Sequence, residues 1–337
     1  MASSSGKFTF ADLCCGIGGF HLGLAGPSST CILACDIDPS CRETYEKNYG
    51  IKVQDDIFKL DDQAVVCDVL AAGFPCQSFS RAGLQRGMAD ERAKVYDKIV
   101  SIVEHSKPKI VLLENVKNLV IINHGAVLQQ IRQDFRDLGY RMTYAVLNTR
   151  HFGLAQNRER VFLVCVDESR CAAPFDFSRL ESRNNTTTLD QVCRSPDDVA
   201  TEECVPEDDF TLLGSNVWKT QRSGLIFCGY LNKKQRTNGT RPNTLHLSRV
   251  HKQPNRIYHI HGTHPTLSSS ESSGRYFIYD TRHVRRMTLD ECYRIQGFPE
   301  DFQKHPKKNK AFSHVGNSVC PIIIKEIKEE LIRQGLI

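Results

Sequence analysis

Residues 8–24 read FTFADLCCGIGGFHLGL, which combines an apolar strand pattern, a glycine-rich turn and the start of a helical pattern. Gly16, Gly18 and Gly19 lie at the turn, where the lack of a Cβ lets the backbone bend sharply and approach a ligand closely. Asp36 follows the next apolar run and is placed to accept a hydrogen bond from a ribose hydroxyl. These features predict a domain that binds a nucleoside-containing cofactor. They do not distinguish a nicotinamide dinucleotide from S-adenosylmethionine.

Strand and helix patterns alternate through the first 168 residues. The strand patterns cover 8–13, 30–36, 65–73 and 109–116, and helical patterns cover 41–49 and 95–105. Such alternation predicts a parallel sheet covered by helices on both faces. Two further strand patterns, at 142–149 and 160–167, have no long helix between them and are expected to pair antiparallel. We therefore predict an α/β fold with a doubly wound, mostly parallel sheet.

The character of the chain changes after Asp167. Between residues 167 and 217 there are twelve acids and four arginines, whereas residues 219–286 hold thirteen basic residues and two acids. The basic region contains short aromatic or branched runs that read as strands of a small second domain. A helical pattern returns at 289–298 and again in the last residues, where apolar side chains recur at helical spacing. We expect a catalytic domain of residues 1–170 plus 287–337 and a target-recognition domain with its linker at 171–286.

Composition excludes several classes of protein. No run of about 18 apolar residues is present, so no membrane span is expected. The N-terminus has no basic region followed by a long apolar stretch, so no secretory signal is expected. Several of the 14 cysteines lie within apolar runs and no CxxC pair occurs, which favours a reduced intracellular protein without a structural metal.

Two residues that follow strand patterns suggest covalent chemistry. In AGFPCQSFSRAG (72–83), Cys76 comes directly after a proline at the carboxyl end of a strand, where open α/β sheets bind ligands. In VLLENV (111–116), four apolar residues place Glu114 at the end of another strand, where a carboxylate is costly without a partner or a task. A buried free thiol and a helix-capping acid are the alternatives. Together the two residues make a nucleophile and an acid plausible.

A further pair of residues lies in QNRER (156–160). Arg158 and Arg160 are two positions apart, so in a strand both guanidinium groups would project to the same side. Two surface arginines are the alternative interpretation, and the motif decides nothing by itself.

These four motifs, in this order, resemble the cytosine carbon-5 methyltransferase family. The resemblance continues through RRMTLDECYRIQGFP (285–299) and GNSVCP (316–321), and NRIYHIHGTHPTL (255–267) is similar to the segment that closes the family's recognition domain. Residues 8–168 and 285–325 are covered. One departure is Cys14, because family members commonly have phenylalanine at this position.

The resemblance implies roles for individual residues. Cys76 would be the nucleophile, Glu114 the acid, and Arg158 and Arg160 would help to hold the base and Glu114. The S-adenosylmethionine pocket would be formed by Cys14, Gly16, Ile17, Gly18, Gly19, Asp36, Ile37, Asp56, Ile57, Gly73, Pro75, Asn317, Ser318 and Val319. Contacts to double-stranded DNA would come from Ser78, Arg81, Gln85, Arg86, Lys233, Lys234, Arg236, Arg241, Arg249 and Lys252.

The implied reaction needs this set of groups. Carbon 5 of cytosine is a poor nucleophile, and a Cys76 thiolate that adds to carbon 6 would activate it while Glu114 acts at ring nitrogen 3. The thiol must be partly ionised, which nearby arginines and backbone N–H groups would favour. A base inside a duplex cannot reach such groups, so the target cytosine would be flipped out.

Other functions remain as alternatives. One branch of the family methylates transfer RNA with the same blocks, although GFPCQSFS and ENVKNL look more like the DNA-acting members. A catalytically silent DNA-binding regulator is a second alternative. It would be expected if Cys76 or Glu114 were replaced by another residue, and both are present. A nicotinamide dehydrogenase would leave the Pro-Cys-Gln block unexplained. We expect a restriction-modification enzyme that is monomeric, functionally paired with an endonuclease, and located in the cytoplasm or nucleoid of a prokaryote, or otherwise nuclear or viral.

Overall fold

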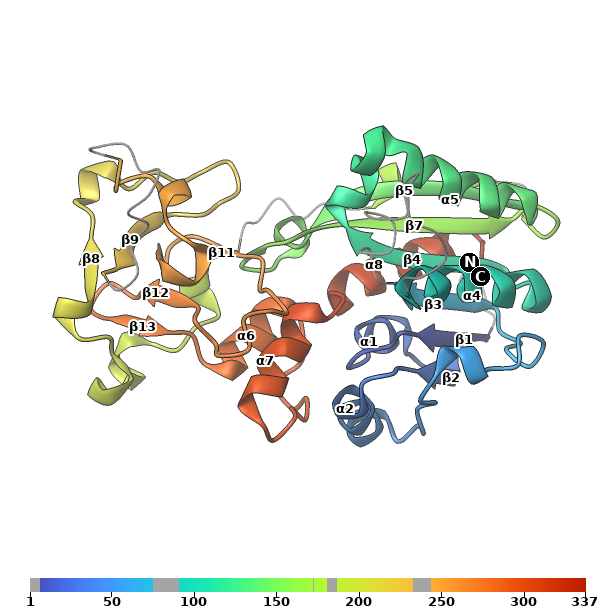
Figure 1. The fold of residues 1–337 in the computed structure, drawn as a ribbon, viewed down its shortest axis with the longest axis horizontal. Helices are drawn as coiled ribbons and strands as arrows, with labels where there is room; N and C mark the ends of the chain where they lie inside the picture. The colour runs from blue at the N-terminus through green and yellow to red at the C-terminus, as the bar shows by residue number, and fades with distance from the viewer. Residues whose placement is uncertain (1–6, 75–90, 172, 181–186, 233–243) are drawn as a thin grey trace. The chain divides into compact units, whose positions relative to one another are not determined.

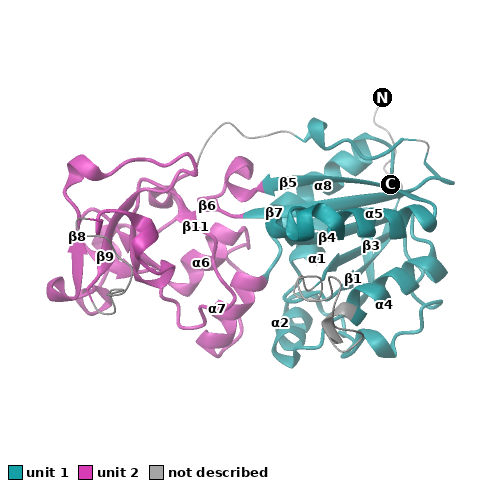
Figure 2. Ribbon diagram, turned by 45° about the horizontal axis from the view of Figure 1, so that its top comes forward, with its two compact units in different colours: residues 1–147, 159–182, 318–337 teal, residues 148–158, 183–317 magenta. Residues whose placement is uncertain are grey.

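The computed structural model of the chain describes residues 7–74, 91–171, 173–180, 187–232 and 244–337. The chain forms two compact units (Figure 2). Unit 1 comprises residues 1–147, 159–182 and 318–337, and unit 2 comprises residues 148–158 and 183–317. These bounds differ from the domains expected from the sequence, because residues 287–317 belong to unit 2 and only the last segment, from Ser318, returns to unit 1.

Unit 1 is built on a six-stranded sheet in the order β2-β1-β3-β4-β7-β5 (Figure 1). β1 is parallel to β2 and β3, β3 is parallel to β4, and β7 runs antiparallel to β4. The strands are β1 (Phe8–Leu13), β2 (Ser29–Cys35), β3 (Val69–Gly73), β4 (Ile110–Val116), β5 (Tyr140–Asn148) and β7 (Glu159–Asp167). The strand expected at 65–73 begins only at Val69, and the other strands start and end within two residues of their expected positions.

Helices cover both faces of this sheet, which confirms the doubly wound class. α4 (Glu91–Ser106) and α5 (Ala126–Asp137) contribute Ile102 and Phe135 to a core that includes Ala11 of β1. Successive residues of a strand face opposite sides, and the neighbouring Phe10 contacts His21 of α1 (Gly19–Leu24) at a centroid distance of 5.4 Å. α1 therefore covers the other face, where it packs against α8 (Pro321–Arg333). The next crossover, from β2 to β3, contains α2 (Pro39–Tyr49).

Unit 2 contains a five-stranded sheet in the order β13-β12-β10-β9-β8 and a two-stranded ribbon of β6 and β11. The larger sheet comprises β8 (Phe210–Leu212), β9 (Phe227–Leu231), β10 (Arg256–His259), β12 (Phe277–Tyr279) and β13 (Val284–Arg286). The ribbon comprises β6 (Gln156–Asn157) and β11 (His264–Pro265), and the helices are α6 (Leu289–Gln296) and α7 (Lys308–Asn317).

A buried ion pair explains why α6 belongs to unit 2. Arg285 of β13 is fully buried and donates to both carboxylate oxygens of Glu291 of α6 at 2.8 Å. The same carboxylate accepts the backbone N–H groups of Arg194 at 2.9 Å and Thr288 at 2.7 Å. Burial of a charged pair is tolerated when its hydrogen bonds are satisfied in this way. The pair fastens α6 to the sheet of unit 2 and to the acidic segment before it.

None of the helices in the described residues is both long enough and apolar enough to cross a membrane.

Candidate active site

The glycine turn between β1 and α1 has the backbone conformation that the sequence predicted. Gly16 and Gly18 have positive φ values of 54° and 84°, and Cys14 also adopts a positive φ of 53°. A Cβ added at Gly19 would lie 2.4 Å from the carbonyl oxygen of Val319 and 2.9 Å from Oγ of Ser318. The turn therefore packs directly against Ser318 and Val319, and only glycine fits at this contact.

Asp36 closes the turn from the end of β2. One oxygen of its carboxylate accepts the N–H of Gly16 at 2.7 Å, and the other accepts the N–H of Asp38 at 2.8 Å. Burial raises the pKa of Asp36. The next side chain, Ile37, is 79% exposed and offers an apolar surface beside the carboxylate. Because Asp36 already occupies the Gly16 amide, this amide is not free to bind a pyrophosphate as the glycine loops of dinucleotide sites do.

A second carboxylate lies beneath the turn. Asp12 of β1 is fully buried, and its Oδ2 accepts the N–H of His21 at 3.2 Å. Its Oδ1 has no hydrogen-bond partner among the residues that the structure describes. Burial raises the pKa of Asp12, and burial together with the charges of Asp36 and Asp12 raises the pKa of the Cys14 thiol. The carboxylate of Asp36, which is partly exposed at the turn, favours a cationic or hydroxyl-bearing group and disfavours a pyrophosphate, so it fits S-adenosylmethionine.

Two further cofactor candidates of unit 1, Asp56 and Ile57, follow the segment beside the end of β2. Asp56 accepts the N–H of Phe58 at 2.9 Å and caps the short 3₁₀ turn that begins with the buried Ile57. The N–H of Asp36 donates to the carbonyl of Gln54 at 3.0 Å, which holds this segment beside the end of β2.

Gly73, the last residue of β3, links the cofactor residues to Glu114. A Cβ at Gly73 would lie 3.8 Å from Cγ2 of Val319 and 3.9 Å from Oε2 of Glu114. Glu114 stands opposite Gly73 in the register of β3 and β4. The structure therefore brings the expected acid next to the end of the strand that precedes Cys76.

Glu114 is paired with Arg160. The carboxylate residue is 8% exposed, and its Oε1 lies 3.2 Å from Nε of Arg160 on the neighbouring strand β7. A guanidinium group beside a buried carboxylate fixes the carboxylate's orientation and compensates part of its desolvation.

Asn115 is a residue of this site that no sequence motif singled out. Its side chain is 3% exposed, and Nδ2 donates to the carbonyl of Phe74 at 2.9 Å while Oδ1 accepts the N–H of Val116 at 2.8 Å. Phe74 is the last described residue before Cys76, so Asn115 fixes the point at which the chain leaves β3. The signal available in the sequence was its place beside Glu114 at the end of a buried strand.

Arg158 does not share a strand with Arg160. β6 ends at Asn157 and β7 begins at Glu159, so the side alternation expected for residues of one strand does not apply. Arg158 belongs to unit 2, is 2% exposed, and donates through Nη1 to the carbonyls of Leu267 and Gly316, each at 3.1 Å. Its described hydrogen bonds hold backbone segments of unit 2 together.

Several expected residues lie outside the described part of the chain or in unit 2. Outside the described residues are Pro75, Cys76, Ser78, Arg81, Gln85, Arg86, Lys233, Lys234, Arg236 and Arg241. Asn317 is the exposed last residue of α7 in unit 2. Arg249 and Lys252 are exposed on unit 2, as DNA contacts must be.

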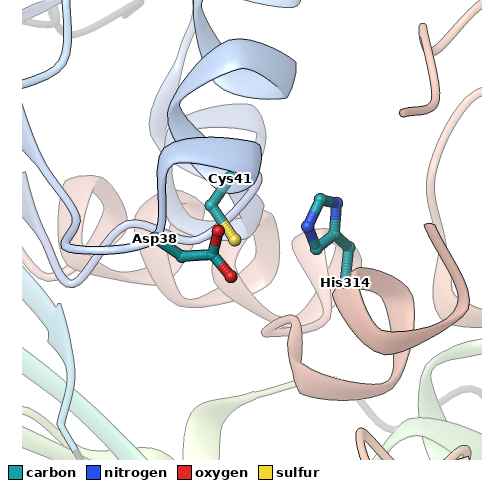
Figure 3. A group of neighbouring side chains, drawn as sticks. All are labelled: Asp38, Cys41 and His314. Carbon is teal, nitrogen blue, oxygen red and sulfur yellow. The ribbon is translucent and has the colours of Figure 1, made fainter. Parts of the chain in front are cut away.

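Asp38 and Cys41 lie on the first turn of α2, where the sulfur of Cys41 is beside the carboxylate of Asp38 (Figure 3). Oδ1 of Asp38 accepts the N–H of Ser40 at 2.8 Å and its hydroxyl at 2.7 Å, so the carboxylate caps the helix. His314, also labelled in Figure 3, belongs to α7 of unit 2. The expected absence of a metal stays a prediction.

Known proteins are similar to this chain in sequence and in fold. The model of the family described as C-5 cytosine-specific DNA methylase matches residues 8–333. Type II methyltransferase M.HhaI of Haemophilus parahaemolyticus is 30% identical over 94% of this chain and 92% of its own. Type II methyltransferase M.NgoBI of Neisseria gonorrhoeae is 32% identical over 94% and 91%. The Dnmt2 methyltransferase of S. pombe has a TM-score of 0.67 at 18% identity, over 96% of this chain and 98% of that one.

Proposed function

The chain belongs to the C-5 cytosine-specific DNA methylase family, and on this premise we propose how its own residues methylate carbon 5 of cytosine in DNA. The observation that carries the proposal is the buried pair of Glu114 and Arg160, at 3.2 Å, beside the end of β3. A nucleophile two residues beyond Phe74 and an acid opposite Gly73 are the two groups that this chemistry requires.

We assign the cofactor site to the glycine turn and its neighbours. Asp36 orients the turn and presents its carboxylate to a cationic cofactor, and Ile37 offers an apolar surface beside it. Ser318 and Val319 close the site from the last block of unit 1. When bound, S-adenosylmethionine supplies the electrophilic methyl group. Asp56, Ile57, Gly73, Pro75 and Asn317 complete the proposed set.

The proposed reaction proceeds through a covalent bond to the base. The Cys76 thiolate adds to carbon 6 of cytosine, and Glu114 gives a proton to ring nitrogen 3, so that electron density develops at carbon 5. Carbon 5 then takes the methyl group, and the electron pair of the broken carbon–sulfur bond would stay on the sulfur of the leaving S-adenosylhomocysteine. Loss of the carbon-5 proton to a base then expels the Cys76 thiolate and restores the ring, and nitrogen 3 returns its proton to Glu114. Arg160 holds Glu114 in place throughout.

We assign target recognition to unit 2. Arg249 and Lys252 are exposed there and suit phosphate contacts, which position the duplex without reading its sequence. Polar side chains of the same unit read the base edges, and the target cytosine leaves the helix to reach Glu114.

The biological role that fits best is modification of DNA in a restriction-modification system, inside the cell, with an endonuclease as functional partner and the methylase acting as a monomer. The Type II names of the relatives favour this role. DNA from cells that express the protein should resist cleavage by an endonuclease of matching target. Complete cleavage by every endonuclease whose site overlaps a methylated cytosine would contradict it.

Methyl transfer from labelled S-adenosylmethionine to mixed-sequence duplex DNA and to bulk transfer RNA tests the activity itself. Wild type should label DNA, and Cys76→Ser should label neither substrate while still binding DNA. Label found only in RNA would move the protein to the RNA-acting branch. No label in either substrate, with DNA binding intact, would make it a silent binder.

A further inference from the structure

An aromatic layer lies directly under the glycine turn. Tyr49, from the last turn of α2, stacks on the ring of His21 of α1 with a centroid distance of 3.9 Å and an interplanar angle of 20°. Nδ1 of His21 lies 2.7 Å from the hydroxyl of Tyr45, which in turn is 3.4 Å from Oδ2 of Asp12. The layer is therefore anchored to β1 at one end, while Tyr49 faces the turn at the other.

Tyr49 makes two direct contacts to the backbone of the turn. Its hydroxyl donates to the carbonyl oxygens of Gly18 at 3.0 Å and Ile17 at 3.3 Å. Its ring occupies the space beside Gly18, because a Cβ there would lie 2.3 Å from Cε2 of Tyr49. The tyrosine ring thus leaves no room for a side chain at residue 18.

These contacts fix the direction of the peptide groups on the turn. A peptide unit is planar, so a carbonyl held by the Tyr49 hydroxyl also fixes the N–H of the following residue. The Ile17 carbonyl and the Gly18 N–H belong to one such plane, and that N–H donates to Cys15 at 2.9 Å. The Gly18 carbonyl shares its plane with the N–H of Gly19. Tyr49 therefore holds two consecutive peptide planes from the side of α2.

The layer adds no positive charge that would repel a cation. Burial lowers the pKa of His21 to about 4, so its ring is neutral at pH 7. Burial, with Asp12 as a further cause, raises the pKa of the Tyr49 hydroxyl, which therefore stays protonated and remains a donor.

We propose that Tyr49 is a positioning residue for the cofactor: its hydroxyl holds the Ile17–Gly18–Gly19 backbone in the conformation that receives S-adenosylmethionine. The inference rests on the proposed function and adds a residue that touches the glycine turn from outside the pocket. A residue with this role affects cofactor affinity and leaves the chemical step unchanged once the cofactor is bound.

Tyr49→Phe tests the role, because phenylalanine keeps the ring and removes only the hydroxyl. Tyr140→Phe is the matched control, since the buried Tyr140 hydroxyl donates to the carbonyl of Pro108 at 2.6 Å, where the chain enters β4. Each variant loses hydrogen bonding to backbone carbonyls, so both are expected to unfold at a somewhat lower temperature.

Calorimetric titration with S-adenosylhomocysteine and steady-state kinetics separate the two variants. We expect the Kd and the KM for the cofactor to rise about 5- to 10-fold in Tyr49→Phe, with kcat at saturating cofactor within twofold of wild type. Tyr140→Phe should leave all three constants unchanged. In the cofactor-free protein, amide exchange at Gly18 should be faster in Tyr49→Phe only.

Three results would overturn the proposal. The Kd of Tyr49→Phe could equal that of wild type, both tyrosine variants could lose affinity equally, or Tyr49→Phe could fail to fold, which would make the hydroxyl structural. A wild-type protein that does not bind S-adenosylhomocysteine would instead contradict the proposed function. The two failures are therefore distinguishable.

Discussion

At the scale of single residues, Glu114 shows how one contact limits the chemistry. Its carboxylate is nearly buried and held by one arginine, so it acts from one orientation. In its protonated form, a buried carboxyl group with a fixed direction can deliver a proton to a ring nitrogen with little reorganisation at the moment of reaction. In this arrangement, the catalytic contribution of Glu114 depends on the proton that its side chain carries and not on the shape of that side chain.

Glu114→Gln should lower kcat by about 10²- to 10⁴-fold, because glutamine keeps the shape but cannot transfer the proton. The Kd for the cofactor should change less than twofold. Glu159→Gln is the control, since Glu159 is partly exposed and pairs with Lys117 at 3.0 Å. A kcat of Glu114→Gln within threefold of wild type would remove Glu114 from the proton-transfer role.

His264 connects the stability of unit 2 to pH. Its ring is 2% exposed, and burial lowers its pKa to about 4, against an ordinary value of 6.5. Between these pH values the unfolded chain binds a proton that the folded chain does not. Unfolding is therefore favoured as the pH falls from 6.5 to about 4, by roughly 1.4 kcal/mol per pH unit.

Urea unfolding of wild type and His264→Gln between pH 7.5 and 4.5 measures this contribution. The difference in unfolding free energy between the two proteins should narrow as the pH falls below 6.5, because glutamine does not titrate. A difference that stays constant over the whole range would show that His264 is not the buried neutral group described here.

At the scale of elements, the positions of strands and helices follow from the sequence but their contacts do not. The period of apolar residues located α2, α4, α6 and α8 and most strands, since burial of one face imposes that period. The spacing of apolar residues does not reveal that Gly23 of α1 lies against Ile324 of α8, because the two residues are 301 positions apart in the sequence. Likewise, the interruption at Arg158 depends on a carbonyl at Gly316 that the local sequence does not contain.

Gly23→Ala should destabilise the protein by about 1–3 kcal/mol, although alanine is the better helix former by about 1 kcal/mol. A Cβ at Gly23 would lie 2.4 Å from Cβ of Ile324, so α1 and α8 would have to separate. Gly26→Ala is the control, because the first atom that its Cβ would meet is 3.5 Å away. Thermal unfolding that ranks Gly26→Ala as the less stable variant would refute this packing argument.

At the scale of the whole molecule, the two regions expected from composition have other bounds than the two compact units. The change of charge after Asp167 is a surface property, whereas the bounds of unit 2 follow from buried contacts such as Arg285 to Glu291. Ion pairs of this kind join charged residues that are buried in the fold. Hydropathy predicts that such residues are exposed, so it places them on the surface instead of in the core. The position of the last block, from Ser318, could be predicted only through its resemblance to the family.

The distribution of charge over the molecule determines its affinity for DNA. The chain carries 44 basic and 39 acidic residues, so affinity for a polyanion depends on where the basic residues stand rather than on the net charge. Arg249 and Lys252 are exposed on unit 2. Residues 219–286, to which both belong, include thirteen basic and two acidic residues. If they neutralise phosphates, each contact releases counterions, and the slope of log affinity against log salt changes by about 0.9 per contact.

Fluorescence anisotropy with a duplex of mixed sequence, from 50 to 300 mM salt, should give a steep negative slope for wild type. Arg249→Gln combined with Lys252→Gln should make that slope shallower by about 2. Lys325→Gln is the control, because Lys325 is an exposed cation of α8 in unit 1, 3.9 Å from Glu329. Equal slopes for all three proteins would exclude Arg249 and Lys252 as phosphate contacts. A wild-type affinity independent of salt would exclude unit 2 as an electrostatic surface for duplex DNA.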